Sequence, residues 1–401
     1  MSFARTSVSM ATPQVAATIF PIVGVIFTGY LVVGVAMPVL PLHVHQGLGF
    51  GTFVVGVVAG SQFGACLISR FTAGHLADVR GAKHAVLIGL LAGGAAGMLY
   101  LLSLAFVGTP TISLMTLLLG RAVLGSAESF MVAGALNWGL ALAGAKHTGK
   151  VMSWMGTARY AAHAAGAPAG SALYALYGFA SVAIATTLIP LLILVLVARL
   201  DPVPASPHAR PAVRKVLGSV WIPGVGLALS CVGYGAITTF VVLLFAQRGW
   251  GQAWIALTAV SIAFIVGRLL FGHLPDRIGG PRVALASVLV QATGQGLIWL
   301  ASTPLLVFAG AALAGLGYSL VYPGFGVKAI GRAPPENRGL AVGAYTACLD
   351  LALGIASPVL GLIACATDLS AVFLVSAIVV LCAAGIAICL LTPLKAAVQE
   401  G

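Results

Sequence analysis

RFTAGHLADVRGAK, at residues 70–83, decides the fold of this chain, because a close copy, RLLFGHLPDRIG, returns at residues 268–279. Both copies follow the pattern Arg-x3-Gly-His-Leu-x-Asp-x2-Gly, and each joins two long apolar runs. The copies lie 198 residues apart (268 minus 70), close to half of the 401-residue chain. Only 7% of the residues are charged, so two matching charged turns between apolar runs indicate a duplicated membrane protein.

The composition independently predicts an all-α polytopic membrane protein. Hydrophobic residues make up 60% of the chain and the mean hydropathy is +1.09. Apolar runs recur at about the 20-residue length that a helix needs to cross a bilayer core, and the short alternating strands of a membrane barrel are absent. We expect twelve transmembrane helices in two pseudo-symmetric six-helix bundles, at residues 16–40, 52–72, 84–106, 112–142, 150–174, 180–198, 217–245, 254–272, 283–302, 304–328, 340–363 and 370–392.

A polar segment separates the predicted halves. Residues 201–216 contain four prolines and three basic residues, and we interpret them as a cytoplasmic linker between domains at 1–200 and 217–401. Of the twenty Lys and Arg residues, Arg121 and Arg159 fall inside spans, Arg248 falls on one face of the membrane, and all others fall on the opposite face. The positive-inside rule therefore predicts that both termini are cytoplasmic. The net charge of +12 is then a topology signal with an attraction for membrane lipid, and we expect no nucleic-acid partner.

Cysteine and histidine residues do not predict a metal centre or a disulfide. The six cysteines are scattered singly, which predicts free and buried thiols. His43 and His45 lack carboxylate or thiolate neighbours, so we expect no bound metal. No Walker loop, Rossmann glycine pattern or nucleophile elbow occurs, so we expect neither a cofactor nor enzymatic chemistry.

Several motifs resemble one transporter family. The turn at residues 74–83 is similar to the signature loop of the major facilitator superfamily, and its echo at residues 272–280 stands where that family repeats it. Arg121-x3-Gly125 is similar to the second motif of the family, and residues 166–170 partly match the glycine-proline motif of its exporters. Residues 40–44 and 158–160 look most like the YhhS-like bacterial permeases, a group filed beside arabinose-efflux and drug-efflux transporters.

The resemblance covers the whole chain and implies a monomeric transporter of the bacterial inner membrane. Two departures weaken the case for export. Val79 follows Asp78 directly, where the family usually has an arginine, and Arg80 is displaced by one position. In the helix-five motif, Ala167 separates the glycine from the proline and Ser171 replaces a second glycine.

The two charged turns are predicted to form a conformational latch. Asp78 and Asp276 are expected to stand before helices, where a carboxylate complements the helix dipole by about 0.3 to 1 kcal/mol. Each follows an arginine by eight residues and so can join two helices at the cytoplasmic face. The resemblance implies that this latch stabilises the outward-open form, and a simple helix cap is the alternative. The proposed latch residues are Arg70, Gly74, Asp78, Arg80, Gly81, Arg268, Gly272, Asp276, Arg277 and Gly279.

Ionisable residues inside predicted spans mark a candidate site, because each costs roughly 2.5 to 3.5 kcal/mol at the bilayer centre. Arg121 and Glu128 share one helix face, and Arg159 and His163 share a face of the next helix. Counting about 16 Å from the cytoplasmic helix start puts Asp350 near the midplane. A neutral pairing of either arginine with Glu128 would be purely structural. Alternatively, Glu128 and Asp350 carry protons, and the arginines tune them or bind an anionic or hydroxyl-bearing substrate.

Other polar and aromatic side chains could line a central cavity or simply pack helices together. These candidates are Tyr30, Gln62, Asn137, Tyr160, Tyr234, Thr238, Gln291, Gln295, Tyr318, Tyr322 and Tyr345. We therefore predict a proton-coupled secondary transporter of a small organic solute, with efflux by proton antiport preferred over symport uptake of a sugar or organic anion. The competing classes are a transport-dead sensor and a membrane-embedded enzyme, but the mid-depth charges and the lack of a long loop favour transport.

Overall fold

The computed structural model describes residues 12–144, 147–203, 213–331 and 338–391, and within these ranges all regular structure is helical. The first half contains α1 (Thr12–Ala36), α2 (Leu40–Leu42), the π-helical turn η1 (His43–Gly47), α3 (Thr52–Val79), α4 (Ala82–Leu104), α5 (Pro110–Ala143) and α6 (Thr148–Ala198). The second half contains α7 (Val213–Gln247), α8 (Trp254–Phe271), α9 (Leu274–Ile278), α10 (Gly280–Trp299), α11 (Pro304–Gly331), α12 (Arg338–Ala366) and α13 (Leu369–Leu391).

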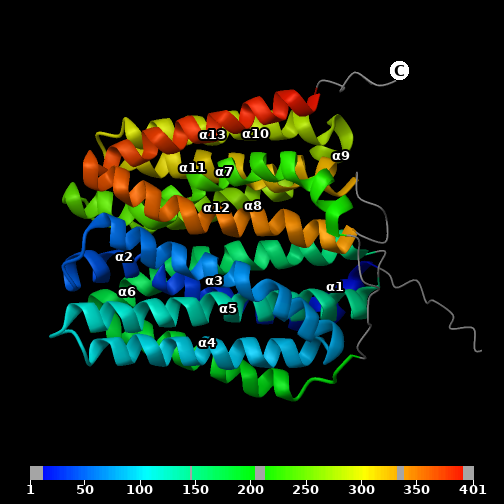
Figure 1. The fold of residues 1–401 in the computed structure, drawn as a ribbon, viewed down its shortest axis with the longest axis horizontal. Helices are drawn as coiled ribbons and strands as arrows, with labels where there is room; N and C mark the ends of the chain where they lie inside the picture. Colours follow the sequence, from blue (N-terminus) through cyan, green and yellow to red (C-terminus); the bar gives the residue numbers. More distant parts are fainter. Residues whose placement is uncertain (1–11, 145–146, 204–212, 332–337, 392–401) are drawn as a thin grey trace, which may run out of the picture.

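The membrane-crossing helices number twelve in the described part of the chain. Ten described segments are long and apolar enough to cross a membrane. Helix α6 supplies one further crossing, because Gly178 leaves helical geometry at a φ of 69° and divides it into two helices. Helix α10 supplies the other, and its lower hydropathy comes partly from Gln291 and Gln295, which bond to α7. The long helices lie side by side (Figure 1), and the predicted all-α fold of twelve spans is confirmed.

Most helix boundaries lie within four residues of those predicted, and two of the differences change how the chain runs from one helix to the next. The first span ends at Ala36, four residues early, because the chain turns at Pro38 and continues through α2 and η1. The second span was expected to end at residue 72 but continues to Val79, and Gly81 then turns the chain with a φ of 96°. Nine residues of α3 therefore follow Arg70, which places Arg70 about 14 Å inside the helix end. Asp78 lies in the last turn of α3, not directly before α4.

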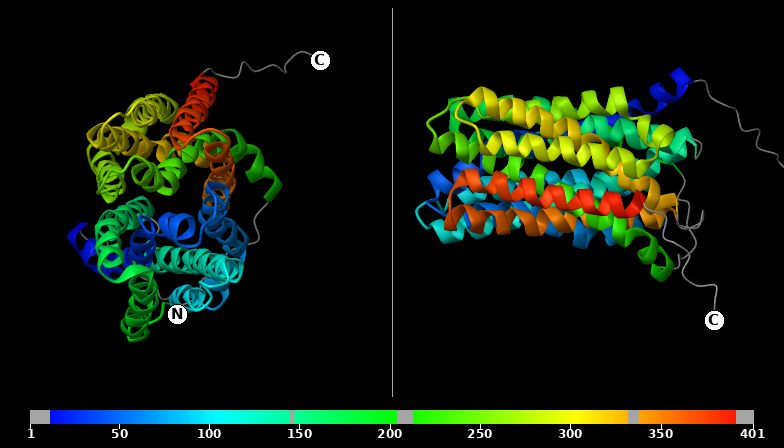
Figure 2. Two further views of the ribbon diagram at one scale, coloured as in Figure 1. Left: turned by 90° about the vertical axis from the view of Figure 1, so that its left-hand side faces the viewer. Right: turned by 90° about the horizontal axis from the view of Figure 1, so that it is seen from above.

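The helices form two groups that meet along two seams. In the first half α1 packs on α6, and α5 packs on α3 and α4; in the second half α11 packs on α8 and α10, and α7 packs on α12 and α13. The seams between the halves are α3 with α12 and α6 with α8. Viewed along the helices, the two groups are stacked one above the other (Figure 2). The domain division at 201–216 stays a prediction, because residues 204–212 lie outside the described residues.

The two ends of the bundle differ in charge. Lys83, at the start of α4, donates hydrogen bonds of 2.8 and 2.6 Å to the carbonyls of Ala198 and Leu200 at the end of α6. Helix α9 lies at this end of the molecule, and α2 lies at the other (Figure 1). We call these the basic end and the opposite end. Both chain termini and the predicted anchors Arg5, Lys146, Arg210, Arg332 and Lys395 lie outside the described residues.

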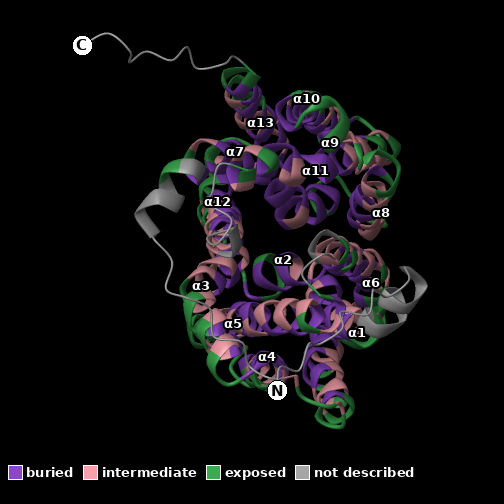
Figure 3. Ribbon diagram, turned by 90° about the vertical axis from the view of Figure 1, so that its right-hand side faces the viewer, coloured by how far each residue is buried: buried purple, intermediate pink, exposed green. Residues whose placement is uncertain are grey.

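The core lies inside each helix group, and apolar side chains also cover its outside. Figure 3 shows buried residues turned toward the helix contacts. Large apolar side chains such as Ile68 and Leu305 are nonetheless more than 70% exposed, as expected of surfaces that face lipid. Cys66 and Cys231 are buried as predicted, but burial is wrong for Cys365, Cys382 and Cys389, which lie on outward faces of α12 and α13.

The histidines after α1 serve the turn that joins α1 to α3. His43 is buried and stacks on Phe179 with ring centroids 3.9 Å apart. The Nδ1 atom of His45 lies 2.7 Å from the carbonyl oxygen of Phe50. Among the described residues no group of three or more His, Cys, Asp or Glu is placed to hold a metal ion.

Glycine allows the closest helix approaches. A Cβ atom at Gly125 of α5 would overlap the carbonyl oxygen of Gln62 on α3. Gly166 and Gly170 of α6 meet the backbone of α1 at Gly34 and Val35 in the same way. Such contacts replace side-chain packing with backbone packing in membrane helices. Gly125 therefore brings the following turn of α5, which carries Glu128, against the side chain of Gln62.

Substituting Gly125→Val should force α3 and α5 apart. Overpacking of this kind typically costs about 1 to 3 kcal/mol, so we expect a lower thermal midpoint for the purified protein in detergent. Gly64→Val is the matched control on α3, because an added Cβ there meets no atom within 4 Å. The measurement is loss of the monodisperse size-exclusion peak after heating. Equal midpoints for the two variants would contradict the packing role of Gly125.

Candidate functional site

The predicted intramembrane charges are buried in the structure. Arg121 is 6% exposed, Glu128 is 2% exposed and Asp350 is 4% exposed, while Arg159 is partly buried. Arg159, Arg121 and Asp350 are each close enough to Glu128 to interact with its charge. The prediction that these four residues lie within the membrane-spanning helices agrees with the structure. Glu128 and Asp350 belong to one cluster and Arg159 to a second, while Arg121 lies in neither.

The first cluster contains both carboxylates. Glu128 Oε1 accepts a hydrogen bond from Gln62 Nε2, and Asp350 forms an ion pair with Arg70, whose Nε also donates to Asp350 Oδ2 over 3.0 Å. Cys66 lies between the carboxylates, with its Sγ 3.7 Å from Asp350 Oδ2. Gln62, Cys66 and Arg70 belong to α3, Glu128 belongs to α5 and Asp350 belongs to α12. We call these five residues the carboxylate cluster, and it joins the two halves.

The neutral pairing of an arginine with Glu128 does not occur. Among the described residues neither Arg121 nor Arg159 forms an ion pair with Glu128, and Arg121 Nε instead donates to the carbonyl oxygen of Val58 over 3.2 Å. Arg70, which was predicted to lie at a helix end, is a fifth charge inside the bundle and is partly buried. Its position follows from the extra two turns of α3. The site therefore holds three arginines and two carboxylates.

The predicted latch is arranged differently. Arg70 pairs with Asp350, not with the aspartate eight residues later, and Asp78 accepts a hydrogen bond of 2.9 Å from Asn137 of α5. In the second copy Arg268 donates to the carbonyl oxygen of Ser319 over 3.4 Å. Asp276 is exposed within the short helix α9. The pairing of Arg70 with Asp78 is thus corrected, because α3 carries both residues and directs Arg70 toward α12.

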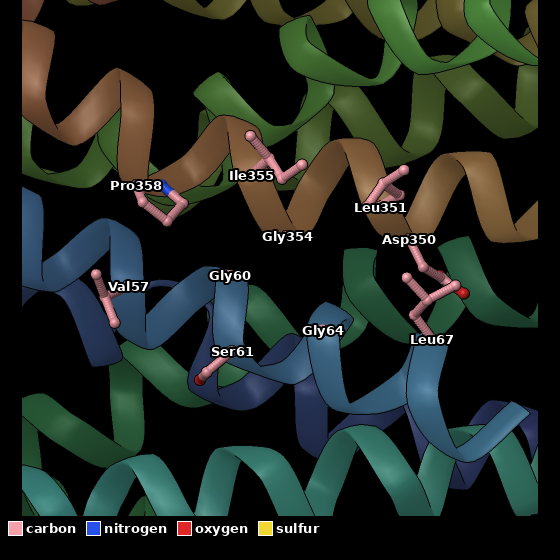
Figure 4. Close-up of a pocket in the computed structure, with 10 residues that line it drawn as sticks. All are labelled: Val57, Gly60, Ser61, Gly64, Leu67, Asp350, Leu351, Gly354, Ile355 and Pro358. Carbon is pink, nitrogen blue, oxygen red and sulfur yellow. The ribbon is translucent and has the colours of Figure 1, made fainter.

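A groove between α3 and α12 reaches the carboxylate cluster. It encloses a cavity of about 320 Å³ whose polar side chains are Ser61 and Asp350. Asp350 and Leu67 lie at one end, and Val57 and Pro358 lie at the other (Figure 4). Leu351 and Ile355 at the rim are more than half exposed.

The second cluster surrounds Arg159. The guanidinium carbon of Arg159 lies 4.6 Å from the ring centroid of Tyr30 and 6.0 Å from that of Tyr160, distances typical of cation–π contacts. The ring of His163 meets each of these tyrosines edge-on at 5.7 Å. Tyr30 comes from α1, and the other three residues come from α6.

Aromatic residues of the second half complete this cluster. Tyr160 stacks on Phe264 of α8 with centroids 3.5 Å apart, and His163 Nδ1 lies 3.1 Å from the hydroxyl of Tyr234 on α7. Tyr234 stacks in turn on Tyr318 of α11 at 5.0 Å. We call Tyr30, Arg159, Tyr160, His163, Tyr234, Phe264 and Tyr318 the aromatic cluster. Both halves of the protein contribute residues to this cluster.

Several other candidates hold helices together in this structure. Gln291 and Gln295 of α10 donate to the carbonyls of Ser230 and Gly233 on α7, over 2.8 and 2.7 Å. Tyr345 donates to the carbonyl oxygen of Tyr322 over 2.9 Å. The Thr238 hydroxyl bonds to the backbone of its own helix. These side chains therefore lie outside the two clusters.

Helices α3 and α12 touch through their backbones toward the opposite end of the bundle. Thr52 of α3 donates to the carbonyl oxygen of Gly361 on α12 over 2.8 Å, and Gly56 meets the backbone of Ser357. Nearer the basic end, Gly74 of α3 and Gly343 of α12 each have open space where a Cβ would stand. Backbone contact therefore holds α3 and α12 together toward the opposite end of this seam.

Comparisons with known proteins agree with this architecture. The sequence profile of the Major Facilitator Superfamily matches residues 22–280 and 224–400. An uncharacterized MFS-type transporter of Salmonella typhimurium is 40% identical over 363 residues, covering 90% of this chain and 93% of its own. Another from Pseudomonas aeruginosa is 42% identical over 380 residues, covering 95% and 94%.

Solved structures share the fold at low sequence identity. A bacterial homologue of the human lysosomal transporter Spinster, in an inward-facing and occupied conformation, aligns with a TM-score of 0.74 at 12% identity, covering 95% of this chain and 97% of its own. The human organic anion transporter MFSD10 aligns with a TM-score of 0.68 at 12% identity, covering 94% of this chain and all of its own. The sequence match along nearly the whole chain and the twelve-helix fold establish that this protein belongs to the major facilitator superfamily of membrane transporters.

Proposed function

We propose that this protein is a proton-coupled secondary transporter of a small organic solute, with Glu128 and Asp350 as proton sites. The observation that carries the proposal is the carboxylate cluster, in which both buried acids bond to side chains of α3 and Asp350 does so across the contact between the halves. The concentration of basic residues supports an orientation in which the basic end faces the cytoplasm of a bacterial inner membrane.

The surroundings of Glu128 suit a carboxyl group that gains and loses a proton. Gln62 Nε2 donates to Glu128, while Gln62 Oε1 is buried with no hydrogen-bond partner among the described residues. An ionised carboxylate accepts from the amide nitrogen, and a protonated carboxyl can also donate to the amide oxygen. One neutral side chain therefore offers a partner to both forms of Glu128.

Asp350 is suited to couple protonation to movement of the halves. Its ion pair with Arg70 crosses the α3–α12 seam, so separation of that seam exposes or breaks the pair. A proton on Asp350 removes the attraction and lowers the cost of separation. In this structure the pair is intact, and α3 and α12 are in backbone contact toward the opposite end. This arrangement supports alternating access in which each proton site is reached from one side at a time.

Direction of transport has two candidate answers. Efflux by proton antiport is our first candidate, on the exporter-like stretch at residues 166–170. That stretch also has a packing role, because Gly166 and Gly170 allow α6 to approach α1. Proton symport is the second candidate. It is favoured by Arg159, which has no carboxylate in ion-pair distance among the described residues and suits an anionic solute.

Proton movement in everted vesicles tests the central claim. Vesicles energised acid-inside and loaded with a pH-sensitive dye receive pentoses, lipophilic cations and organic anions one at a time. Antiport predicts recovery of fluorescence for a transported compound, and symport predicts acidification of de-energised vesicles on addition of that compound. Glu128→Gln should reduce either signal to background, because the amide cannot release a proton, whereas Asp201→Asn at the surface should not. Equal signals from wild type and Glu128→Gln would sink the assignment of Glu128.

Asp78→Asn tests the signature turn separately. The amide can still accept a hydrogen bond from Asn137, so this change removes the charge and keeps the contact. A partly exposed charge interaction is worth roughly 0.2 to 1 kcal/mol, so its loss should lower the transport rate by up to about five-fold at an unchanged protein level in the membrane. Normal turnover would show that the charge of Asp78 plays no part in the transport cycle.

The Arg70–Asp350 pair should be strongly coupled energetically. Either single change, Arg70→Gln or Asp350→Asn, leaves one buried charge unpaired, at a typical cost of about 3 to 5 kcal/mol. The double variant removes both charges and should recover much of that stability. The comparison is made from thermal midpoints in detergent. Additive losses in the double variant would indicate that the two side chains do not act as a pair.

A further inference from the structure

We infer that Arg159 and His163 form the anchor for the anionic group of an organic anion, whose apolar part lies against the surrounding tyrosines. This inference rests on the proposed transport function and deepens it by naming the chemical class of the solute. It concerns the aromatic cluster, which is separate from the carboxylates proposed to carry protons.

Arg159 differs from other arginines of the bundle in having no hydrogen-bond acceptor among the described residues. Three other arginines within the long helices each have an acceptor: Asp350 for Arg70, the Val58 carbonyl for Arg121 and the Ser319 carbonyl for Arg268. Arg159 has no hydrogen bond among the described residues, and its Nε atom is buried without a partner. A buried donor without an acceptor costs about 1 to 3 kcal/mol, and more when it is charged. The site is therefore incomplete as it stands.

A second buried nitrogen atom without a hydrogen-bond partner lies close to Arg159. His163 lies one turn beyond Arg159 on α6, is 2% exposed, and has a buried Nε2 atom with no hydrogen-bond partner. Its Nδ1 atom pairs with the hydroxyl of Tyr234. When that hydroxyl donates to Nδ1, the ring hydrogen resides on Nε2. Arg159 and His163 then present two donors on one helix face, and both require an acceptor.

The positive and negative charges inside the bundle are unequal in number. Three arginines inside the bundle, Arg70, Arg121 and Arg159, face the two carboxylates, and the Arg70–Asp350 pair accounts for one charge of each sign. Arg121 and Arg159 remain against Glu128, which is bonded to a neutral amide. When Glu128 is protonated, both remaining arginines lack a counter-charge. An anion is the ligand that restores neutrality, and the planar guanidinium suits a carboxylate or phosphate group.

The aromatic rings around Arg159 indicate the chemistry of the rest of the ligand. Tyr30 and Tyr160 flank the guanidinium, and Phe264, Tyr234 and Tyr318 extend the aromatic surface into the second half. Aromatic rings supply apolar area with polar edges. Because the walls come from both halves, a ligand held here contacts the two parts that must move relative to each other. A carboxylate attached to an aromatic or apolar body fits these surroundings better than a cation or a polar sugar.

Binding to the purified full-length protein in lipid nanodiscs tests the inference without any transport assay. The probes are benzoate, phenylacetate and 1-naphthoate, each paired with its own uncharged amide, together with tetraphenylphosphonium, and the measurement is isothermal titration calorimetry. Loss of a charge-assisted contact should make the amides bind about ten-fold or more weakly than the carboxylates. Arg159→Gln should weaken carboxylate binding by a similar factor, and Arg159→Lys should weaken it less, because the charge is retained.

Arg199→Gln is the matched control, because it removes the same charge from an exposed position at the end of α6. It should leave carboxylate binding unchanged. Should Arg159→Gln fail to fold, the Lys variant and the carboxylate–amide comparison in the wild type carry the test. Equal binding of acids and amides, preference for the cation, no binding by any carboxylate, or normal binding in both Arg159 variants would each overturn the inference. Proton movement that depends on Glu128 without carboxylate binding would overturn this inference and leave the proposed function standing. Carboxylate binding without such proton movement would support this inference and overturn the proposed function.

Discussion

The free-energy cost of an unpaired charge in a low-dielectric interior determines how the charged side chains are arranged between the helices of this protein. Arg70 and Asp350 meet this cost together, since each is the ionic partner of the other across the α3–α12 seam. The pair can form only because the helices approach closely, and they do so through Gly56, Gly60 and Gly354, where backbones touch. Helix packing and charge pairing therefore depend on each other. Separating the halves at this seam changes both at once, which makes the seam a two-state element.

The two clusters differ in whether their polar side chains have partners. The carboxylate cluster contains acids that already have partners, one an arginine and the other an amide. The aromatic cluster contains basic groups with unfilled hydrogen bonds. The proposed proton sites Glu128 and Asp350 lie on α5 and α12, and the proposed solute anchor Arg159 lies on α6, yet Glu128 and Arg159 are close enough for their charges to interact. Coupling between the two events requires no direct contact, because occupancy at one cluster alters the electrostatic environment of the other.

The sequence was sufficient to predict the class of fold and most of the site. Apolar run lengths gave twelve spans because bilayer thickness fixes the length of a helix, and the burial of Glu128 and Asp350 followed from counting residues along their helices. The position of Arg70 was missed, since an arginine before a glycine-containing turn is also typical of a helix end. Local sequence did not reveal that α3 continues to Val79. The partner of Asp350 depended on which helices meet, and no single helix encodes that.

The hydrogen bonds of Lys83 have a mechanical consequence. Its ammonium group holds the carbonyls of Ala198 and Leu200, so the start of α4 is fastened to the place where α6 ends and the chain leaves the first half. Gly81 and Lys83 belong to the same turn as Asp78. The signature turn and the departure point of the linker therefore form one rigid corner. Any rotation of that corner therefore moves the start of α4 and the end of α6 together.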